Sequence, residues 1–304
     1  MKIKNIIPLL IGVLLSVNVI AQQDPLFSQY QFNQSFFNPA YTGINDVFNA
    51  SIIARTQWVG LPGAPKTYTV NASTSLVNNK LGLGVLLTSD NYGINKNNNF
   101  QVLYSYKIDL LNGKVFSFGL QSGYERFRYD FDALLLEQAD PSLVIQDNNI
   151  GKFNVGAGVF FKTKQFYLGV SVPKLINNQY ENNGINSILT QRHLYVSAGY
   201  VFDPLISIKF KPSFVLKIVE GQSVSLDLNA SILLLETLWV GVTLRDFNTA
   251  GLNMQFELGD MLRLGYSFEM PFNELSVNNF GTHELMVSID LELFNNHAAG
   301  RRYF

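Results

Sequence analysis

Polar and apolar residues alternate along most of the chain with a period of two. In residues 224–234 an apolar set that begins at Val224 alternates with a polar set that begins at Ser225. Residues 206–218 and 262–270 alternate in the same way. Because successive side chains of a β-strand point to opposite faces of the sheet, the pattern predicts strands with one polar and one apolar face.

About fourteen such runs of roughly ten residues follow one another, and this is the length of strand that a transmembrane barrel needs. We expect the runs to begin near Phe48, Tyr68, Leu81, Phe100, Lys114, Lys152, Gln165, His193, Ile206, Val224, Leu238, Ala250, Met261 and His283. The pattern therefore predicts an all-β outer-membrane β-barrel of about 14 antiparallel strands, an even number as such barrels have.

The lengths of the predicted connections support the barrel. The even-numbered connections are all short, at residues 78–79, 111–113, 163–164, 203–204, 235–236 and 259–260. The long ones are all odd-numbered, at residues 89–98, 127–150, 174–191 and 271–281. Short turns on the periplasmic side and longer loops outside produce this parity. A soluble β-rich domain would share the alternation but has no reason to share the parity, and the lack of a repeat of 20 to 50 residues argues against a propeller.

The first residues have the features of an export signal. Lys2 and Lys4 precede an uncharged stretch from Ile6 to Ile20, and small or branched residues end it at Ala21. This pattern predicts a signal peptide over residues 1–21, cleaved near Ala21. The stretch is shorter than the roughly 20 apolar residues of a spanning helix, and no later stretch qualifies, so we expect no transmembrane helix.

Composition agrees with a membrane barrel. The chain is 47% hydrophobic and 15% charged, with 24 Phe and 14 Tyr, more apolar surface than the core of a soluble domain would use. The net charge of −1 gives no field that would attract nucleic acid. With no Cys, the chain has neither disulfides nor thiolate metal sites.

A segment of about 25 residues, 22–46, lies between the signal peptide and the first strand, and the barrel is expected over residues 47–304. The pairs Asp24-Pro25 and Asn38-Pro39 start turns, and Gly43 allows a positive φ just before the first strand. Between them aromatic residues are interspersed with Ser, Gln and Asn, a composition suited to docking against a polar wall. We therefore expect this segment to pack into the periplasmic mouth of the barrel, with a flexible periplasmic leader as the alternative.

These residues also carry a resemblance. The run QDPLFSQYQFNQSFFNPAYTG at residues 23–43, followed by RTQW at residues 55–58, resembles the opening signature of the PorP/SprF family of type IX secretion system outer-membrane proteins, known from gliding and protein-secreting Bacteroidetes. Shorter elements at residues 239–245, 264–267 and 281–285 are similar to the later elements of that family, so the resemblance covers most of the mature chain. Thr42 and Thr282 depart from it, where Ala and Ser are frequent. The motif residues that the resemblance marks as candidates for docking are Asp24, Pro25, Phe27, Ser28, Gln29, Tyr30, Asn38, Pro39, Gly43, Arg55, Gln57 and Trp58.

The register of the predicted strands turns charges of both signs into the barrel interior. A pore that selects ions tends to carry rings of one sign, whereas balanced charges favour an interior that is cross-linked by ion pairs or holds a plug. The main candidates for such interior charges are Lys209, Lys211, Asp227, Arg245, Glu257, Arg263, Glu269, Glu284 and Asp290.

The sequence gives little support to catalysis or to a cofactor. His193, His283 and His297 lie at strand starts or near the C-terminus, outside any zinc-protease helix or nucleophile elbow. Residues 95–99 and 177–186 are rich in Asn, but they lack the spaced acidic residues of a calcium loop, so we expect solvated loops and no metal. Two aromatic residues compete for the terminal position that barrel assembly recognises, Phe294 and Phe304.

The resemblance implies a function that the strand pattern alone does not. It implies an outer-membrane protein that supports, without catalysis, the export or surface attachment of a large secreted client such as an adhesin or protease, by docking the client or the secretion machinery. Two alternatives remain at this point. One is a transporter of small or hydrophobic solutes through a plugged barrel, and the other is a structural barrel that links the outer membrane to periplasmic partners.

Overall fold

The computed structural model describes residues 27–130, 149–182, 185–205, 208–273, 276–277, 279–299 and 303. The predicted signal peptide, Asp24, Pro25 and Phe304 lie outside the described residues. Within the described part of the chain, no helix is long and apolar enough to cross a bilayer.

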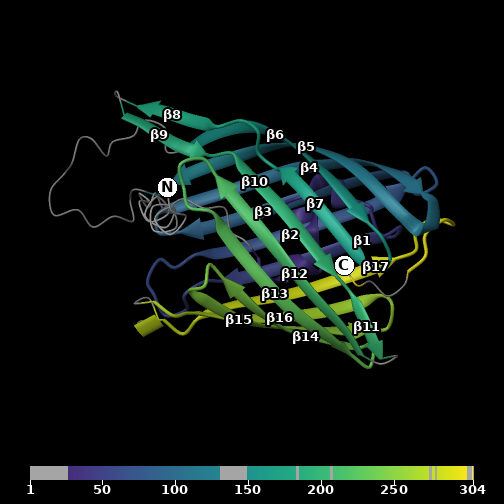
Figure 1. Cartoon of the computed structure of the whole chain (residues 1–304). Helices are drawn as coiled ribbons and strands as arrows, with labels where there is room; N and C mark the ends of the chain where they lie inside the picture. The colour runs from purple at the N-terminus through teal and green to yellow at the C-terminus, as the bar shows by residue number, and fades with distance from the viewer. Residues whose placement is uncertain are drawn as a thin grey trace, which may run out of the picture.

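Fourteen antiparallel strands form a closed barrel (Figure 1). Each strand pairs with its neighbours in the chain, and β1 pairs with the last strand, β17, from Phe48 opposite Leu291 to Thr56 opposite His283. The ring consists of β1 (Phe48–Thr56), β2 (Lys66–Leu76), β3 (Leu81–Tyr92), β4 (Asn95–Leu110), β5 (Lys114–Tyr129), β6 (Asn149–Lys162), β7 (Phe166–Val172), β10 (His193–Tyr200), β12 (Ile208–Val219), β13 (Ser225–Leu234), β14 (Leu238–Arg245), β15 (Thr249–Leu258), β16 (Leu262–Pro271) and β17 (Thr282–Leu291).

Three short strands are additions to this ring. β8 (Asn178–Asn182) and β9 (Ile185–Thr190) form a separate hairpin that projects from one end of the barrel (Figure 1). β11 (Phe202–Leu205) follows β10 and pairs with the start of β12. The sequence pattern missed all three, because it treated residues 174–191 and 203–204 as connections.

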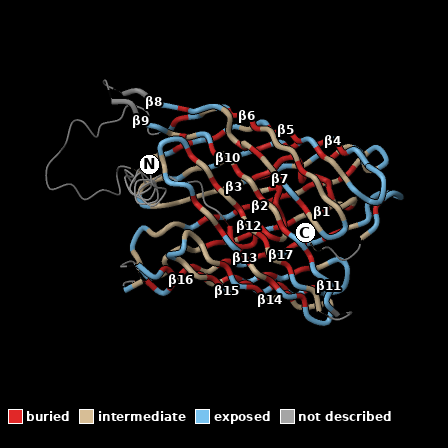
Figure 2. Tube along the Cα trace, viewed as in Figure 1, coloured by how far each residue is buried: buried red, intermediate tan, exposed pale blue. Residues whose placement is uncertain are grey.

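The alternation predicted from the sequence is confirmed in the wall. Along β13 the polar residues Ser225, Asp227, Asn229 and Ser231 are buried inside the barrel, while Leu228 and Ile232 are exposed on its outer face. Buried and exposed positions alternate in this way along the strands (Figure 2). The outer face is thus apolar and the inner face polar, as a barrel in a membrane requires.

Connections divide the barrel into two ends. We call the end with residues 77–80, 111–113, 163–165, 235–237 and 259–261 the turn end, and the end with residues 57–65, 173–192 and 272–281 the loop end. The predicted parity therefore holds, but the predicted long connection at residues 89–98 was wrong. There β3 runs to Tyr92 and β4 starts at Asn95, because Gly93 takes a positive φ in a tight turn and the Asn-rich run joins β4 as strand.

Residues 27–46, which we call the plug segment, lie inside the ring of strands (Figure 1, purple). The segment forms three short 3-10 turns, η2 (Ser28–Gln31), η3 (Gln34–Phe36) and η4 (Pro39–Tyr41). The side chain of Asn33 accepts from the N–H of Ser35, and that of Asn38 from the N–H of Ala40, so each Asn caps the turn that follows. Gly43 has a φ of +64°, the positive value that glycine allows just before β1.

The C-terminal residues turn back onto the turn end. β17 ends at Leu291, so Phe294 lies beyond the last strand and is about half exposed, against His297. His297 is buried and its Nε2 lies 2.8 Å from the carbonyl oxygen of Ser75. The N–H of Ala298 donates to the carbonyl of Asp46 at the end of the plug segment. The tail thus covers part of the turn end, and Phe294 does not close a strand.

Candidate functional site

The plug segment contacts the wall from the turn end to the neighbourhood of the loop end. Near the turn end, the Lys107 ammonium donates to the carbonyl of Gly43 at 2.7 Å, and that of Lys162 to the carbonyl of Ile44 at 2.9 Å. Near the loop end, the backbone N–H groups of Ser28 and Gln29 donate to the Glu284 carboxylate at 3.1 and 2.8 Å. The segment therefore reaches well beyond the periplasmic mouth in which the sequence suggested it would dock.

Four buried charges and the partly buried Arg245 meet beside Ser28 and Gln29 of the plug segment. Arg55 of β1 pairs with Glu269 of β16 at 2.9 Å and with Glu284 of β17 at 3.0 Å. Arg245 of β14 pairs with Glu269 at 3.2 Å and with Asp227 of β13 at 2.8 Å. These bridges connect five strands, β1, β17, β16, β14 and β13, which follow one another around the barrel with only β15 passed over. We call the five residues the loop-end charge cluster.

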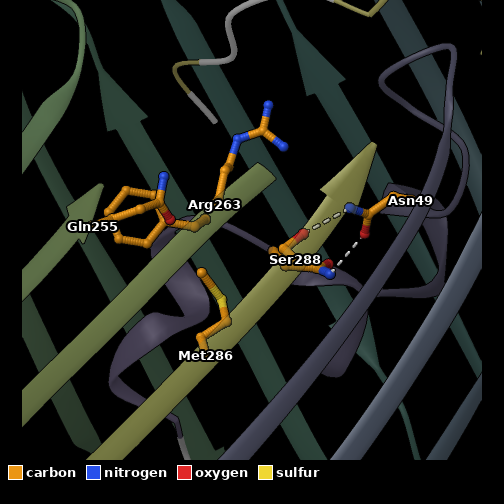
Figure 3. A pocket seen from close by; sticks show the side chains of 7 residues that line it. Asn49, Gln255, Arg263, Met286 and Ser288 are labelled. Carbon is orange, nitrogen blue, oxygen red and sulfur yellow. Dashed lines mark hydrogen bonds between the residues drawn. The ribbon is translucent and has the colours of Figure 1, made fainter. Parts of the chain in front are cut away.

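A second ion pair lies closer to the turn end. The guanidinium of Arg263 contacts Asp290, and the amide of Asn49 donates to Asp290 at 2.8 Å and to Ser288 at 2.9 Å. Beside this pair is a cavity of about 20 Å³ that Gln255, Arg263, Met286 and Ser288 line from the wall (Figure 3). A space of this size holds about one water molecule, so it is a gap in the packing and not a ligand site.

A buried lysine holds the middle of the plug segment against the wall. The ammonium of Lys211 donates to the carbonyls of Gln31 and Tyr303, at 3.3 and 2.8 Å. It also lies 4.7 Å from the ring centre of Phe32 and 4.5 Å from that of Trp239, in the geometry of a cation–π contact. Trp239 in turn donates to Glu257 at 3.0 Å. Lys209 is the neighbouring interior-facing residue of β12 on the side of the turn end. It pairs with Asp203 at the rim of that end.

Wall glycines make room for the plug segment. A Cβ added at Gly119 would overlap the backbone of Pro39 and Ala40, and one at Gly158 would overlap the Asn38 side chain. A Cβ at Gly82 would overlap the carbonyl of Thr42. Because no residue larger than glycine fits at these places, the wall is shaped to the plug segment.

The structure brings most of the predicted motif residues together inside the barrel. Phe27, Ser28, Gln29, Tyr30, Asn38, Pro39 and Gly43 belong to the plug segment, and Arg55 faces it from the wall. Gln57 and Trp58 lie instead at the rim of the loop end and are partly exposed, where the N–H of Trp58 donates to Thr282. The nine predicted interior charges line the barrel wall, where Lys209 is the one nearest the rim.

Several residues that hold the plug segment were not singled out from the sequence. Asn71 faces Asn33 and Ser35, while Ser171, Ser197 and Ser231 bond Phe37, Gln34 and Gln31. The alternation identifies each of them as a polar residue that faces the barrel interior. It does not identify which of the interior-facing residues contact the plug segment.

Ion pairs and hydrogen bonds connect the polar side chains of the described interior. Among the described residues, no group of three or more His, Asp or Glu side chains is placed to hold a metal ion. The three histidines lie apart, with His193 stacked on Tyr195, His283 beside Tyr266 and His297 against Ser75. Residues 95–99 form the start of β4, and much of 177–186 forms β8 and β9, which corrects the expectation of solvated loops there.

Comparison with known proteins adds a family. The model of a family described as type IX secretion system membrane protein PorP/SprF matches residues 19–289. No curated protein matches the chain. Solved structures similar to it include the outer membrane protein Omp33 of Acinetobacter baumannii, at 10% identity and a TM-score of 0.47, over 81% of this chain and 100% of that one. The CymD monoaromatic hydrocarbon channel is similar at 9% identity and a TM-score of 0.49, over 90% and 94% of the two chains.

Proposed function

Since the chain belongs to the PorP/SprF family of type IX secretion system membrane proteins, we propose that its barrel acts without catalysis, by docking clients or periplasmic machinery of that system. The protein is an outer-membrane component of type IX secretion. The finer proposal is that it supports the export or surface attachment of a large secreted protein, such as an adhesin or protease.

The filled interior is the observation that supports docking over transport. Residues 27–46 occupy the interior, and their backbone and side chains bond to wall residues from Lys107 to Glu284. A solute that crossed the barrel would have to displace this segment and break buried charge-assisted hydrogen bonds, each worth about 1.5–3 kcal/mol. A barrel that is filled by its own chain is better suited to present its two ends to other proteins.

Exposed apolar residues at the rim of the loop end support the proposal that the client binds there. Two of its connections are joined, because Val59 donates to the carbonyl of Gly281 at 2.8 Å and Phe280 to the carbonyl of Val59 at 2.7 Å. This rim exposes large apolar side chains, with Phe247 at 69%, Phe272 at 66% and Phe280 at 75% exposure. Exposed apolar clusters with polar surroundings mark interaction sites, and the longer connections of such barrels face the cell exterior.

Affinity isolation from cross-linked, mildly solubilised outer membranes of the native organism tests the proposal. We expect the full-length protein to recover components of the secretion machinery or one large secreted protein. The variant Phe272→Ser/Phe280→Ser should lose the client and keep the machinery. The control variant Leu111→Ser/Leu235→Ser makes the same kind of change at exposed residues of the turn end and should keep the client.

The opposite result identifies the alternative function. If the barrel is recovered alone, and if the reconstituted full-length protein passes small solutes in liposomes, docking is wrong and the protein is a transporter. Deletion of the gene provides a second measurement, because loss of secreted proteins from the cell surface is expected of a secretion component and not of a passive transporter.

A further inference from the structure

Three aromatic residues form a row across the outer face of β4, β5 and β6. Phe100 is paired with Tyr124, and Tyr124 with Phe153, and all three are about half exposed. Toward the turn end, the outward residues of β4 continue as Val102, Tyr104, Tyr106, Ile108 and Leu110, each at least 40% exposed. This row is therefore the loop-end border of the apolar band on these strands.

The height of the band fits a membrane. From Phe100 to Leu110 the strand advances ten residues, which is about 33 Å at a rise of about 3.3 Å per residue. Strands of such barrels tilt by about 40°, which leaves about 25 Å along the membrane normal, the height of the apolar band in outer-membrane barrels. Aromatic residues at its border are expected at the level where lipid chains meet headgroups.

The next outward positions beyond the aromatic row are basic. Arg126 follows Tyr124 on the same face of β5, Arg128 follows Arg126, and Lys96 is paired with Arg128. All three are exposed, whereas the alternating Glu125 and Phe127 are buried inside the barrel. Same-face residues are about 7 Å apart along a strand, so this basic cluster begins one step above the aromatic border.

Among the described residues, one carboxylate is paired with the basic cluster. Asp130 pairs with Lys96 at 2.8 Å, and the hydrogen bond from Lys96, with a smaller contribution from Arg128, lowers the pKa of that carboxyl. Asp130 is therefore ionised and neutralises one of the three positive charges. Arg126 donates from Nε to the side-chain oxygen of Asn149 at 2.6 Å, which orients its guanidinium across the strands. Within the described part of the chain, two net positive charges remain in the cluster.

The opposite wall lacks such a cluster in the described residues. There the outward positions closest to the loop end are apolar, namely Ile218, Leu226, Leu244, Ala250 and Met270. The outward ends of β12 to β16 in the described residues thus carry no counterpart of the basic cluster, in a protein whose net charge is −1. The basic cluster is suited to an anionic partner at the height of the headgroups.

We propose that Arg126, Arg128 and Lys96 bind the phosphate groups of an outer-leaflet glycolipid, whose acyl chains lie along Phe100, Tyr124 and Phe153. Guanidinium groups bind phosphate through paired N–H donors, and the aromatic row supplies the apolar surface directly below. The occupant is a lipid and not a protein because the basic cluster continues the lipid-facing surface of the same strands without a break.

Native mass spectrometry of the full-length protein in detergent, titrated with monophosphorylated lipid A, tests the site. The variant Arg126→Gln/Arg128→Gln should bind this lipid at least about tenfold more weakly than the unaltered protein, because it loses two charge-assisted contacts. The control Lys80→Gln/Lys114→Gln removes the same charge from exposed residues at the turn end and should bind as the unaltered protein does. Heat-modified migration in gels should be unchanged in both variants, since all four side chains point away from the interior.

Lipid A without its phosphates and inorganic phosphate alone identify what is bound. We expect the dephosphorylated lipid to bind about tenfold more weakly than the phosphorylated one, and inorganic phosphate to bind far more weakly than either. Equal binding of phosphorylated and dephosphorylated lipid, or an equal loss in the two double variants, overturns the site. Inorganic phosphate that binds as tightly as the lipid would show a free-anion site and would also overturn the proposal.

Discussion

Replacing Arg55 with Ala should destabilise the barrel more than any exposed substitution. Arg55 is 3% exposed and bonds Glu284 at 3.0 Å and Glu269 at 2.9 Å. Two charge-assisted hydrogen bonds contribute about 1.5–3 kcal/mol each. Removal of one partner from a buried ion pair, which leaves the other charge uncompensated, costs about 3–5 kcal/mol. In the variant, Glu269 is still paired with Arg245, and Glu284 still accepts hydrogen bonds from two backbone N–H groups. We therefore expect the free energy of unfolding to fall by about 3–5 kcal/mol, and not by the sum of the two hydrogen bonds of Arg55 added to this cost.

Urea unfolding of the reconstituted protein, followed by tryptophan fluorescence, measures this loss. Arg55→Lys keeps the charge but not the forked geometry, so it should fall between the unaltered protein and Arg55→Ala. Arg128→Ala removes an exposed arginine and should change the free energy by less than about 0.5 kcal/mol. A value for Arg55→Ala within about 0.5 kcal/mol of the unaltered protein would refute the reasoning, because it would mean that water already solvates the loop-end charge cluster.

Three further predictions concern the plug segment. Gly119→Val should displace the segment without abolishing the barrel, because its Cβ would overlap the backbone of Ala40; faster chymotrypsin cleavage within residues 27–46 would show this, and unchanged cleavage would contradict it. Lys211→Met should lower the free energy of unfolding by about 1–3 kcal/mol, because two carbonyls lose their hydrogen-bond donor. It should also alter the fluorescence emission of Trp239, because the indole loses its cation–π contact, and unchanged emission would contradict that contact. Deletion of residues 23–41 should lower the heat stability of the barrel and open it to solutes in liposomes, whereas unchanged stability and flux would mean that the segment does not fill the interior.

The alternation of polar and apolar residues predicted the strands of the barrel wall, because every strand that crosses a membrane needs an apolar outer face over about ten residues. The same requirement holds for each strand, so even a short strand such as β14 can be recognised in the sequence. The rule fails where strands leave the membrane. β4 begins at Asn95 and not near Phe100, because the polar residues 95–99 pair with β3 and β5 in ladders that continue outside the band.

The contents of the interior were harder to predict, since they depend on which residues meet across the barrel. The resemblance marked Ser28, Gln29 and Arg55, and the register marked Glu269 and Glu284, but nothing in the sequence joined the two sets. They meet because β1 closes the ring on β17, which places Arg55 opposite Glu284. The roles of Gly119 and Gly158 depend in the same way on the path of the plug segment, which has no periodicity of its own.

The charges of the wall match the residues of the plug segment that lie against them. The loop-end charge cluster contains two arginines and three carboxylates, so it has an excess of one negative charge. The N–H groups of Ser28 and Gln29 both point at one of those carboxylates, Glu284, and the Ser28 hydroxyl donates to Glu269 at 2.5 Å. Because burial makes an uncompensated carboxylate costly, the wall favours a segment that brings donors and no charge to this place. The first turn of the plug segment supplies such donors from its backbone, and residues 27–44 contain no charged side chain that would oppose them.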